Sequence, residues 1–395
     1  MNILQVSPAY FPAVSIGGPI YSTLTFSEIL EKNHQLTTVT TQQGLSESQL
    51  KDIQYNKPKA LSENHTLIYK KYLGPANFTF SFSMVLWLLK NTSNYDLIVL
   101  QGVWNFPFIM SAFFARLFRI PYIIFPHGSL YQETVYLKSS RIKKILYFLA
   151  VKNMLKKAKW ICFTTQDEEL KVKEFLKIHL NAFIVPNVVK SADFTHLPQR
   201  GKWREHFSIS SESTLLLHLG RISQKKGIIF TLHALRNLLD KGYDVQFLLA
   251  GGDEGAYQAQ LNNKISELKL DNYVHFTGLL NREQSLQAFS DSDLFILPSL
   301  SENFGISIVE AMYCGLPVLI SNQVGIAPDI EKNDAGIVLD IDRIELNLST
   351  ALEKLLHDSN RRTQLTAQGK YFAQSHYDSP VLENLINQML QSAIL

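Results

Sequence analysis

Short apolar runs alternate along the chain with longer segments of helical period. In the first half, six runs have the length of buried strands, and they cover residues 2–8, 35–41, 96–102, 122–128, 160–165 and 182–187. Continuous apolar runs separated by amphipathic segments are typical of a parallel sheet with helices on both faces. The pattern therefore predicts an α/β fold.

The pattern stops near residue 190 and then starts again. The polar segment "NVVKSADFTHLPQRGKWREHF" has no sustained period, and after it come six further strand-like runs, at residues 214–221, 244–252, 273–278, 293–299, 317–321 and 336–340. We therefore predict two similar α/β halves, each a doubly wound parallel sheet, joined near residue 190. Ligands of such sheets bind at the carboxyl ends of the strands, so with two sheets we expect the site in the cleft between the domains.

Composition restricts the kind of protein. The length of 395 residues suits two domains, and a net charge of +3 gives no reason to expect a nucleic-acid partner. Cys162 and Cys314 form no disulfide framework and no metal motif. The first residues lack a signal-peptide pattern, and every long apolar stretch is interrupted by charges or proline. We expect a cytoplasmic protein without a bound metal.

The first candidate site is "LGRISQKKG". Arg221 directly follows a predicted strand, and Lys226 precedes Gly227 at an expected helix start. Two cations beside free backbone N–H groups are suited to binding a diphosphate. The alternative is an ordinary solvated loop.

The second candidate is "SENFGISIVEAMYCG", which places Glu302 before a predicted helix, residues 306–314, and Glu310 one turn inside it. On a continuous helix, eight residues span roughly 12 Å, which is far for two carboxylates acting on one bond. One ligand held at two points is the better interpretation. A helix-face salt bridge for Glu310 and a helix-dipole contact for Glu302 remain open.

Two weaker candidates lie in the first half. Gly17 and Gly18 fall in a loop after the first predicted strand, where the lack of side chains allows close approach to a phosphate or sugar. His127 follows the strand at 122–125 and precedes a glycine. A plain turn and a structural histidine are the alternatives.

A basic segment, residues 138–159, offers a different kind of contact. No Asp or Glu occurs between Thr134 and Gln166, and apolar residues in this stretch form one helical stripe. Such a helix can lie on an anionic membrane surface. The alternative is a helix that packs its stripe on the sheet and exposes its lysines.

Taken together, these motifs resemble the glycosyltransferase family 4 enzymes, which are retaining transferases of the GT-B fold with two Rossmann-like domains. The resemblance covers nearly the whole chain, and its most specific part is the E-x7-E motif from Glu302 to Glu310. It implies an acceptor-binding domain at 1–190, a nucleotide-sugar-binding domain at 191–375, and a final helix, 376–395, that packs on the first domain. It also implies a role in bacterial polysaccharide or lipopolysaccharide synthesis, with a glycan or lipid-linked acceptor, at the inner face of the cytoplasmic membrane.

The resemblance also implies roles for individual residues. Arg221 and Lys226 would neutralise the donor diphosphate without a metal, and His127 would orient the sugar or the acceptor. Gly17 and Gly18 would close over the diphosphate or line the acceptor pocket. The remaining residues would bind different parts of the donor. Its sugar would contact Glu302, Asn303, Phe304, Gly305 and Ile306, its ribose Glu310, and its nucleobase Leu279 and Leu280.

Two other functions are weighed against a transferase. A sugar-nucleotide 2-epimerase shares the GT-B fold, but it is expected to lack the paired R-x4-K and E-x7-E motifs. A relative that only binds a nucleotide sugar would have lost cationic or acidic positions, and the principal ones are all present. The sequence gives neither the donor nor the acceptor.

Overall fold

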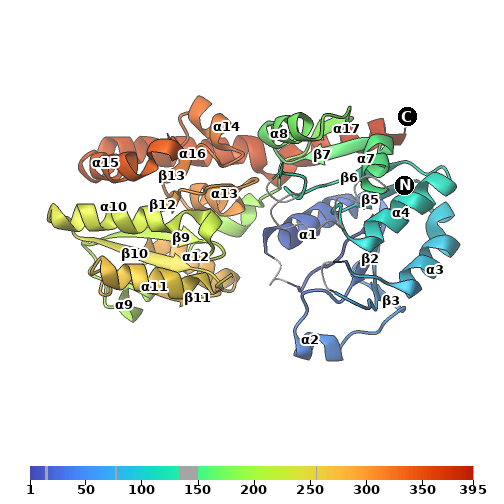
Figure 1. Cartoon of the computed structure of the whole chain (residues 1–395), viewed down its shortest axis with the longest axis horizontal. Coiled ribbons are helices and arrows are strands. Elements are labelled where there is room, and N and C mark those ends of the chain that lie inside the picture. Colours follow the sequence, from blue (N-terminus) through green and yellow to red (C-terminus); the bar gives the residue numbers. More distant parts are fainter. Residues whose placement is uncertain (14–16, 76–77, 133–149, 255, 395) are drawn as a thin grey trace. The chain divides into compact units, whose positions relative to one another are not determined.

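The computed structural model describes residues 1–13, 17–75, 78–132, 150–254 and 256–394 (Figure 1). The chain divides into two compact units. Unit 1 comprises Met1–Val188 with Leu382–Leu395, and unit 2 comprises Val189–Val381. Each unit contains its own sheet and its own hydrophobic core, and each is described here by itself.

Unit 1 is built on a sheet with the strand order β3-β4-β2-β1-β5-β6-β7-β8. The strands are β1 (Asn2–Val6), β2 (Gln35–Thr41), β3 (Pro58–Ala60), β4 (His65–Lys70), β5 (Leu97–Leu100), β6 (Tyr122–Ile124), β7 (Trp160–Phe163) and β8 (Ala182–Ile184). All neighbouring strands are parallel except β3, which pairs antiparallel with β4.

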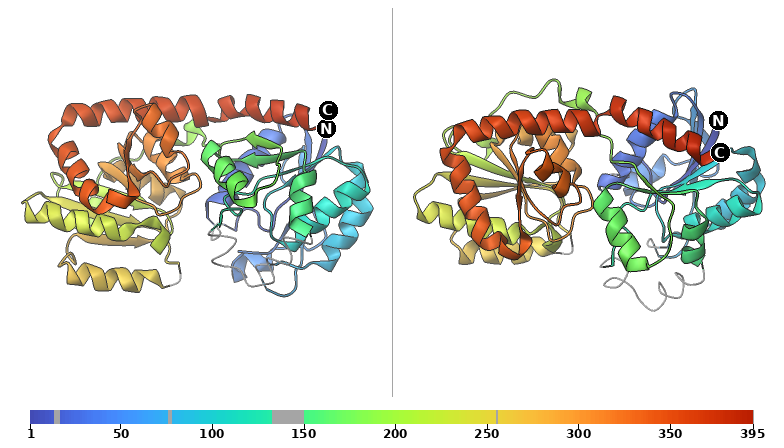
Figure 2. Two further views of the ribbon diagram at one scale, coloured as in Figure 1. Left: turned by 45° about the horizontal axis from the view of Figure 1, so that its top comes forward. Right: turned by 90° about the horizontal axis from the view of Figure 1, so that it is seen from above.

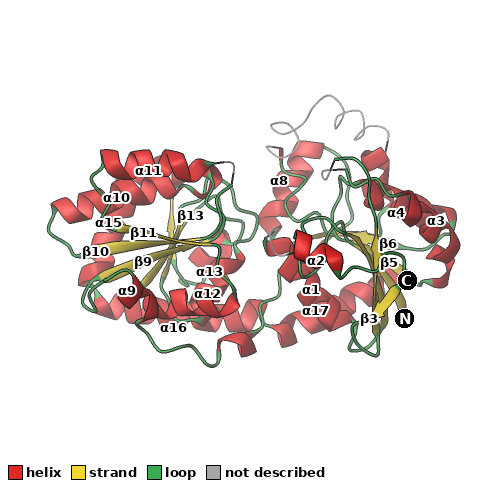
Figure 3. Ribbon diagram, turned by 90° about the horizontal axis from the view of Figure 1, so that it is seen from below, coloured by secondary structure: helices red, strands yellow, loops and turns green. Residues whose placement is uncertain are grey.

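Helices cover both faces of this sheet, as Figure 3 shows. One face packs against α3 (Phe82–Asn91), α4 (Phe106–Leu117), α7 (Lys152–Lys157) and α8 (Gln166–Leu176). The opposite face packs against α1 (Gly18–Leu30) and α17 (Ser379–Ile394), and a short helix, α2 (Glu47–Lys51), lies on the surface. The last helix belongs to unit 1, and Figure 2 shows its course. It is attached there through buried Leu382, Ile386 and Met389 and through an ion pair of Lys32 with Glu383.

The edge hairpin β3–β4 was not among the predicted strands. β3 is exposed at every position and begins with a proline, which suits a short edge strand but leaves no apolar signal. β4 carries "HTLIYK", in which the apolar run is only three residues long and polar residues stand at both ends. The prediction of an entirely parallel sheet was therefore wrong at this edge.

Unit 2 contains a parallel sheet with the order β11-β10-β9-β12-β13-β14. Its strands are β9 (Thr214–Leu219), β10 (Val245–Ala250), β11 (Val274–Gly278), β12 (Leu294–Leu297), β13 (Val318–Ser321) and β14 (Ile337–Leu339). One face packs against α10 (Ile228–Asp240), α11 (Tyr257–Glu267) and α15 (Ile344–His357). The other packs against α12 (Arg282–Asp291), α13 (Ile306–Tyr313), α14 (Ala327–Lys332) and α16 (Ser359–Tyr377).

The continuous apolar runs follow from this arrangement. In β12, Leu294 and Ile296 join the core under α10, whereas Phe295 and Leu297 join the core under α13. Successive side chains of a strand point to opposite faces, so burial of both faces favours apolar residues at nearly every position. The predicted doubly wound α/β fold is thus confirmed.

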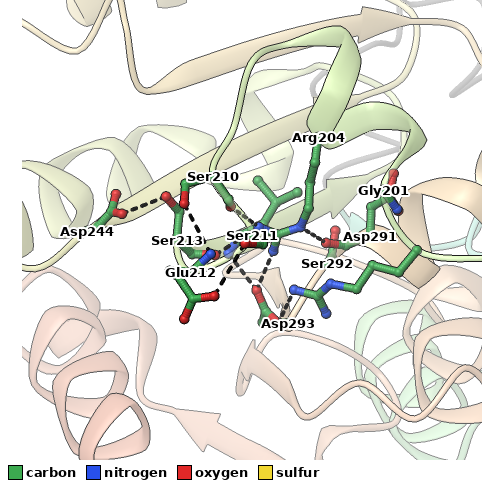
Figure 4. Close-up of polar contacts among 12 residues, drawn as sticks. Gly201, Arg204, Ser210, Ser211, Glu212, Ser213, Asp244, Asp291, Ser292 and Asp293 are labelled. Carbon is green, nitrogen blue, oxygen red and sulfur yellow. Dashed lines mark hydrogen bonds and ion pairs between the residues drawn. The ribbon is translucent and has the colours of Figure 1, made fainter.

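The segment that enters unit 2 is attached to the sheet by a buried arginine in α9 (Lys202–His206) (Figure 4). Arg204 donates to the carbonyl oxygens of Asp291, Ser210 and Ser213 at 2.8, 2.6 and 3.0 Å and to the carboxylate of Asp293 at 2.8 Å. The same Asp293 oxygen also accepts the N–H of Leu215, at the start of β9. One side chain therefore connects a loop, a helix end and a strand.

Replacing Arg204 with Met should lower the free energy of unfolding by about 2–3 kcal/mol, because the substitution removes the Arg204 donor from three carbonyls and one of the donors of the Asp293 carboxylate. The matched control is Arg200→Met, which removes the more exposed partner of Asp293 at 2.7 Å and should cost less than about 1 kcal/mol. Urea unfolding of both variants measures the difference. Equal losses would contradict the structural role of Arg204.

Candidate active site

The predicted cationic and acidic residues of unit 2 meet at the carboxyl edge of its sheet. The strand order places β9 beside β12, and the chain continues from β9 to α10 on one face and from β12 to α13 on the other. This is a topological switch point, where ligands of doubly wound sheets bind. Arg221 and Lys226 follow β9, and Glu302 follows β12.

Lys226 and Glu302 form an ion pair across the switch point. Their side chains are 17% and 18% exposed, so the pair is partly shielded and still reachable from solvent. Burial alone would raise the pKa of the Glu302 carboxyl, but Lys226, Arg221 and the N–H of Phe304 outweigh it, and the pKa is lowered. Glu302 is therefore ionised at neutral pH, beside two cations.

The loops that carry these two residues are attached to each other through their backbones. Leu300 N–H donates to the carbonyl of Lys225 at 2.7 Å, and a Cβ placed on Gly227 would lie 2.0 Å from the carbonyl oxygen of Pro298. Glu302 also exchanges backbone hydrogen bonds with the loop after β13, through Gln323 and Gly325. The site is thus fixed by three loops of one sheet edge.

Replacing Gly227 with Ala should separate the loops after β9 and β12. Gly227 has φ 64° and no room for a Cβ, because the nearest atom is backbone rather than a side chain that can move. Gly242→Ala is the matched control: φ is 85° there too, but nothing lies within 4 Å. We expect the Gly227 variant to be less stable than the control by about 2 kcal/mol in thermal or urea unfolding. Equal stability would contradict the close approach.

Arg221 is held less firmly than Lys226. Its guanidinium is 57% exposed and donates to Glu254 at 3.0 Å. An exposed pair of this kind contributes at most about 1 kcal/mol, so a phosphate can displace Glu254 at little cost. Glu254 was not predicted, and it lies near Arg221 because Ile222 pairs with Asp253 in the neighbouring loop.

Helix α13 begins as the sequence predicts, and it ends within one residue of the prediction. Gly305, with φ 81°, is its N-cap, and Gly315, with φ 82°, follows its end. Asn303 and Ile306 are partly exposed, whereas the ring of Phe304 is buried against Tyr377. Only the backbone of Phe304 is therefore available to a ligand.

Glu310 lies at a separate point of the same edge. Its Oε1 accepts from Arg282 at 2.6 Å, so the glutamate does form a salt bridge, although with α12 rather than along its own helix. Burial raises the pKa of the Glu310 carboxyl, and Arg282 offsets this only in part. Among the described residues, no donor contacts its second oxygen, Oε2.

Leu279 and Leu280 lie between β11 and the start of α12. Leu279 is 68% exposed, and its side chain lies beside Gly252, at the end of β10. Leu280 packs partly against the core under α13. Leu279 thus lies near the loop after β10, whereas Leu280 lies against the core under α13.

In unit 1, the glycine pair is divided between loop and helix. Gly17, with φ 94°, is the N-cap of α1, whereas Gly18 is its first residue. The prediction that both lie in a loop was wrong for Gly18, because Pro19 favours the first turn of a helix and the helix begins one residue before it.

His127 follows β6 and has an unusual positive φ of 49°. Its Nε2 lies 2.8 Å from Oε1 of Gln101, and its ring stacks on Phe125. Burial lowers the pKa of the imidazole to about 4, so His127 is neutral at pH 7. Gln101 was not predicted, since nothing in the sequence indicates that the ends of β5 and β6 bring the two residues together.

The basic segment 138–159 lies partly outside the described residues, which resume at Ala150. In its described part, α7 buries Met154 and Leu155 against the sheet. No helix in the described ranges is both long and apolar enough to cross a membrane. The described residues also contain no group of three or more His, Cys, Asp or Glu placed to hold a metal ion.

Two surface hollows lie elsewhere. One of about 560 Å³ is lined by residues of unit 2 such as Arg200, Cys314 and Arg362, and one of about 430 Å³ by residues of unit 1 such as Lys32, His34 and Asp96. None of the predicted site residues lines either hollow.

Comparison with known proteins identifies the part of the chain that carries this edge. Residues 199–372 match the family of glycosyl transferases group 1. This match covers every predicted site residue of unit 2. The prediction of a glycosyltransferase agrees with it.

Among named relatives, the α-D-kanosaminyltransferase of Streptomyces kanamyceticus is 27% identical over 269 residues, which is 66% of this chain and 66% of that protein. The sulfoquinovosyl transferase SQD2 of Arabidopsis thaliana is 30% identical over 154 residues, 38% of this chain and 28% of that protein. The chain thus spans less than two thirds of the length of either relative.

The fold resembles that of solved glycosyltransferases. HepE of Anabaena, solved in complex with UDP and glucose, has a TM-score of 0.78 at 18% identity and covers 99% of this chain and 100% of its own. WaaG, a glycosyltransferase involved in lipopolysaccharide biosynthesis, has a TM-score of 0.70 at 18% identity, with 98% and 99% covered. The predicted GT-B fold is confirmed.

Proposed function

We propose that the chain is a retaining glycosyltransferase that moves a sugar from a nucleotide-diphosphate donor to a glycan or lipid-linked acceptor. The observation that carries the proposal is the meeting of Lys226, Arg221 and Glu302 at the switch point of the unit 2 sheet. The match of residues 199–372 to the group 1 glycosyl transferases supports the reaction class.

Lys226 and Arg221 are the groups that receive the diphosphate. Negative charge grows on the leaving phosphate oxygen as the bond to the anomeric carbon breaks. Two positioned cations stabilise that charge without a metal, and such electrostatic stabilisation is usually the largest catalytic contribution. Arg221 has to leave its exposed partner, Glu254, to bind the diphosphate. Lys226 is paired with the shielded Glu302, so its ammonium group is already oriented before the ligand arrives.

The two glutamates hold different parts of the donor. Glu302 is ionised and accepts hydrogen bonds from hydroxyls of the sugar, together with backbone groups from Asn303 to Ile306. Glu310 uses Oε1 for Arg282 and keeps Oε2 for the ribose hydroxyls. The nucleobase contacts the backbone at Leu279 and Leu280. In unit 1, Gly17 and Gly18, at the start of α1, keep the contact with the diphosphate or the acceptor that the resemblance implies.

Transfer with retention requires the acceptor oxygen to attack from the face that the phosphate leaves. The bond between the anomeric carbon and the phosphate oxygen breaks, the bond to the acceptor oxygen forms, and the departing phosphate oxygen takes the proton of the acceptor hydroxyl. His127 is neutral and orients a hydroxyl of the sugar or the acceptor. A carbohydrate of a bacterial surface polysaccharide or lipopolysaccharide is the proposed acceptor, reached at the inner face of the cytoplasmic membrane.

A panel of UDP-, GDP- and ADP-sugars, scored by the shift in melting temperature, tests donor binding. A ligand at 100 times its Kd should stabilise the folded protein by about 2.7 kcal/mol. The sugar that gives the largest shift is then incubated with glycan and lipid-linked acceptors. Transfer to an acceptor supports the proposal. No shift with any donor, or epimerisation of the sugar without transfer, contradicts it.

A further inference from the structure

Five polar side chains lie in a row on the α1 face of the unit 1 sheet, one from each of five neighbouring strands or strand ends. In spatial order they are His65 on β4, Thr38 on β2, Gln5 on β1, Gln101 after β5 and His127 after β6. All but half-buried His127 are buried. Parallel strands covered on both faces are normally apolar, so such a row needs a reason.

Hydrogen bonds join the row from end to end. The distances are 2.8 Å from His127 Nε2 to Gln101 Oε1, 3.2 Å from Gln101 Nε2 to Gln5 Oε1, 3.2 Å from Gln5 Nε2 to Thr38 Oγ1, 2.9 Å from Thr38 Oγ1 to His65 Nε2 and 2.9 Å from His65 Nδ1 to Glu31 Oε2. Glu31 caps the end of α1. The row therefore ends on a carboxylate.

Ser27 fixes the direction of these bonds. Its hydroxyl donates to the carbonyl of Thr23 at 2.7 Å, and a carbonyl can only accept. The Ser27 oxygen must therefore accept from the Gln5 amide nitrogen, 2.7 Å away. That orients the amide of Gln5 with Oε1 toward Gln101, so Gln101 donates through Nε2 and turns its own Oε1 to His127.

The rest of the row follows from the same anchor. The second N–H of Gln5 Nε2 donates to Thr38 Oγ1, so the Thr38 hydroxyl donates to His65 Nε2. His65 then carries its proton on Nδ1 and donates it to Glu31. Every group donates toward Glu31 and accepts from the side of His127.

We infer that this one-way row of hydrogen bonds fixes His127 as the Nε2–H tautomer and so presents Nδ1 as a hydrogen-bond acceptor for a ligand hydroxyl. Nε2 must donate, because the only atom that Gln101 offers it is a carbonyl oxygen. In the described part of the chain, no donor contacts Nδ1. Gln101 and Gln5 are thus positioning residues for His127.

The backbone fixes the same imidazole from the other side. The N–H of Gly128 donates to Oε1 of buried Glu168 at 2.7 Å, and Oε2 of Glu168 accepts from the N–H and the hydroxyl of Thr164 at 2.8 and 2.9 Å. These bonds fasten the loop in which His127 has its positive φ. Because the ring is also neutral at pH 7, Nδ1 carries no proton. It can accept a hydrogen bond from a hydroxyl group, but it cannot act as an acid.

The tautomer is tested directly by NMR of the ¹⁵N-labelled full chain at pH 8, without a donor. Two-bond ¹H–¹⁵N correlations of the imidazoles report which nitrogen is protonated, and loss of one set of signals in His127→Asn assigns His127. We expect a single Nε2–H form whose proton exchanges slowly with water. The Nδ1–H form in the unaltered chain would overturn the inference.

Two substitutions of Gln101 separate hydrogen bonding from packing. Gln101→Leu removes the acceptor, so both tautomers and fast proton exchange should appear. Gln101→Glu keeps an acceptor oxygen, so Nε2 should stay protonated. Gln287→Leu, which removes a buried glutamine of α12 in unit 2, is the matched control and should leave the His127 signals unchanged. An unchanged spectrum in Gln101→Leu would overturn the inference.

The identity of the hydroxyl rests on the proposed function, whereas the tautomer does not. With an active donor and acceptor, Gln101→Leu should lower kcat about tenfold, because a misoriented group costs rate rather than affinity, and Gln101→Glu should lower it less. If the unaltered chain transfers no sugar but shows the Nε2–H form, the proposed function fails and the tautomer assignment stands. If it transfers sugar and Gln101→Leu alters the tautomer but not kcat, the role of Nδ1 as an acceptor is overturned.

Discussion

Replacing Lys226 with Ala is expected to lower the kcat of sugar transfer by about 10²–10³-fold, the loss typical of removing one preorganised donor from a developing anion. Lys226 is oriented by Glu302 across the switch point, and no other cation of the described residues pairs with that carboxylate. Steady-state kinetics with the donor found in the nucleotide-sugar panel measures the effect. KM for the donor should change less than kcat.

Lys225→Ala is the control for this experiment. Lys225 precedes Lys226 in the same short turn, Gln224–Lys226, and has the same charge, but it is exposed. Only its carbonyl group is used, as an acceptor for Leu300 N–H, and the substitution keeps it. The Lys225 variant should therefore have a kcat within about twofold of the unaltered chain, a change that long-range charge alone can produce. A near-normal kcat in Lys226→Ala would remove the proposed role of Lys226.

The two glutamates of the E-x7-E motif are expected to affect stability in opposite directions. Glu302→Gln should lower the free energy of unfolding by about 2–3 kcal/mol, because it leaves the shielded ammonium of Lys226 without its counter-charge. Glu310→Gln should leave stability unchanged or raise it by up to about 1 kcal/mol. Its partner Arg282 is 40% exposed and keeps contacts with Asp193 and the ring of Phe194. Urea unfolding of the two variants measures the difference. Equal losses in the free energy of unfolding would contradict the opposite pKa shifts.

The same two variants should differ in their dependence on pH. The pKa of Glu302 is lowered in the folded chain from its ordinary value of 4.5. The contribution of Glu302 to the free energy of unfolding is therefore complete above pH 4.5 and is lost as the pH falls through the lowered pKa. The deficit of Glu302→Gln should therefore shrink in acid. The pKa of Glu310 is raised, so its burial becomes unfavourable as pH rises through that value. Any gain of Glu310→Gln should then appear only toward neutral pH.

The fold could be predicted wherever burial imposes a pattern on the sequence. Strands such as β12 are apolar at every position because helices cover both faces, and α13 is bounded by Gly305 and Gly315, which adopt conformations that favour glycine. β3 and β4 could not be predicted in this way. An exposed edge strand needs no apolar residues, and β4 carries His65, whose burial depends on a partner 34 residues away.

The candidate site was predictable as a set of residues but not as a set of contacts. Arg221, Lys226 and Glu302 stand at recognisable strand ends, so their place at one sheet edge followed from topology. The pairing of Glu310 with Arg282, and of His127 with Gln101, depends on which helices and strands become neighbours. Gln5 in β1 and Gln101 after β5 interrupt apolar runs, and the sequence gives no reason for either residue. Their role follows only from the hydrogen bond that joins them in the row.

The central claim is that the edge formed by Lys226, Arg221 and the start of α13 binds the diphosphate of a sugar nucleotide. Titration calorimetry with uridine, guanosine and adenosine diphosphates and their monophosphates tests it most directly. For one nucleoside, the diphosphate should bind about 100-fold more tightly than the monophosphate, and Lys226→Ala should reduce that ratio about tenfold while Lys225→Ala leaves it unchanged. Equal affinities for diphosphate and monophosphate, no binding of any diphosphate, or a ratio unaffected by Lys226→Ala would contradict the claim.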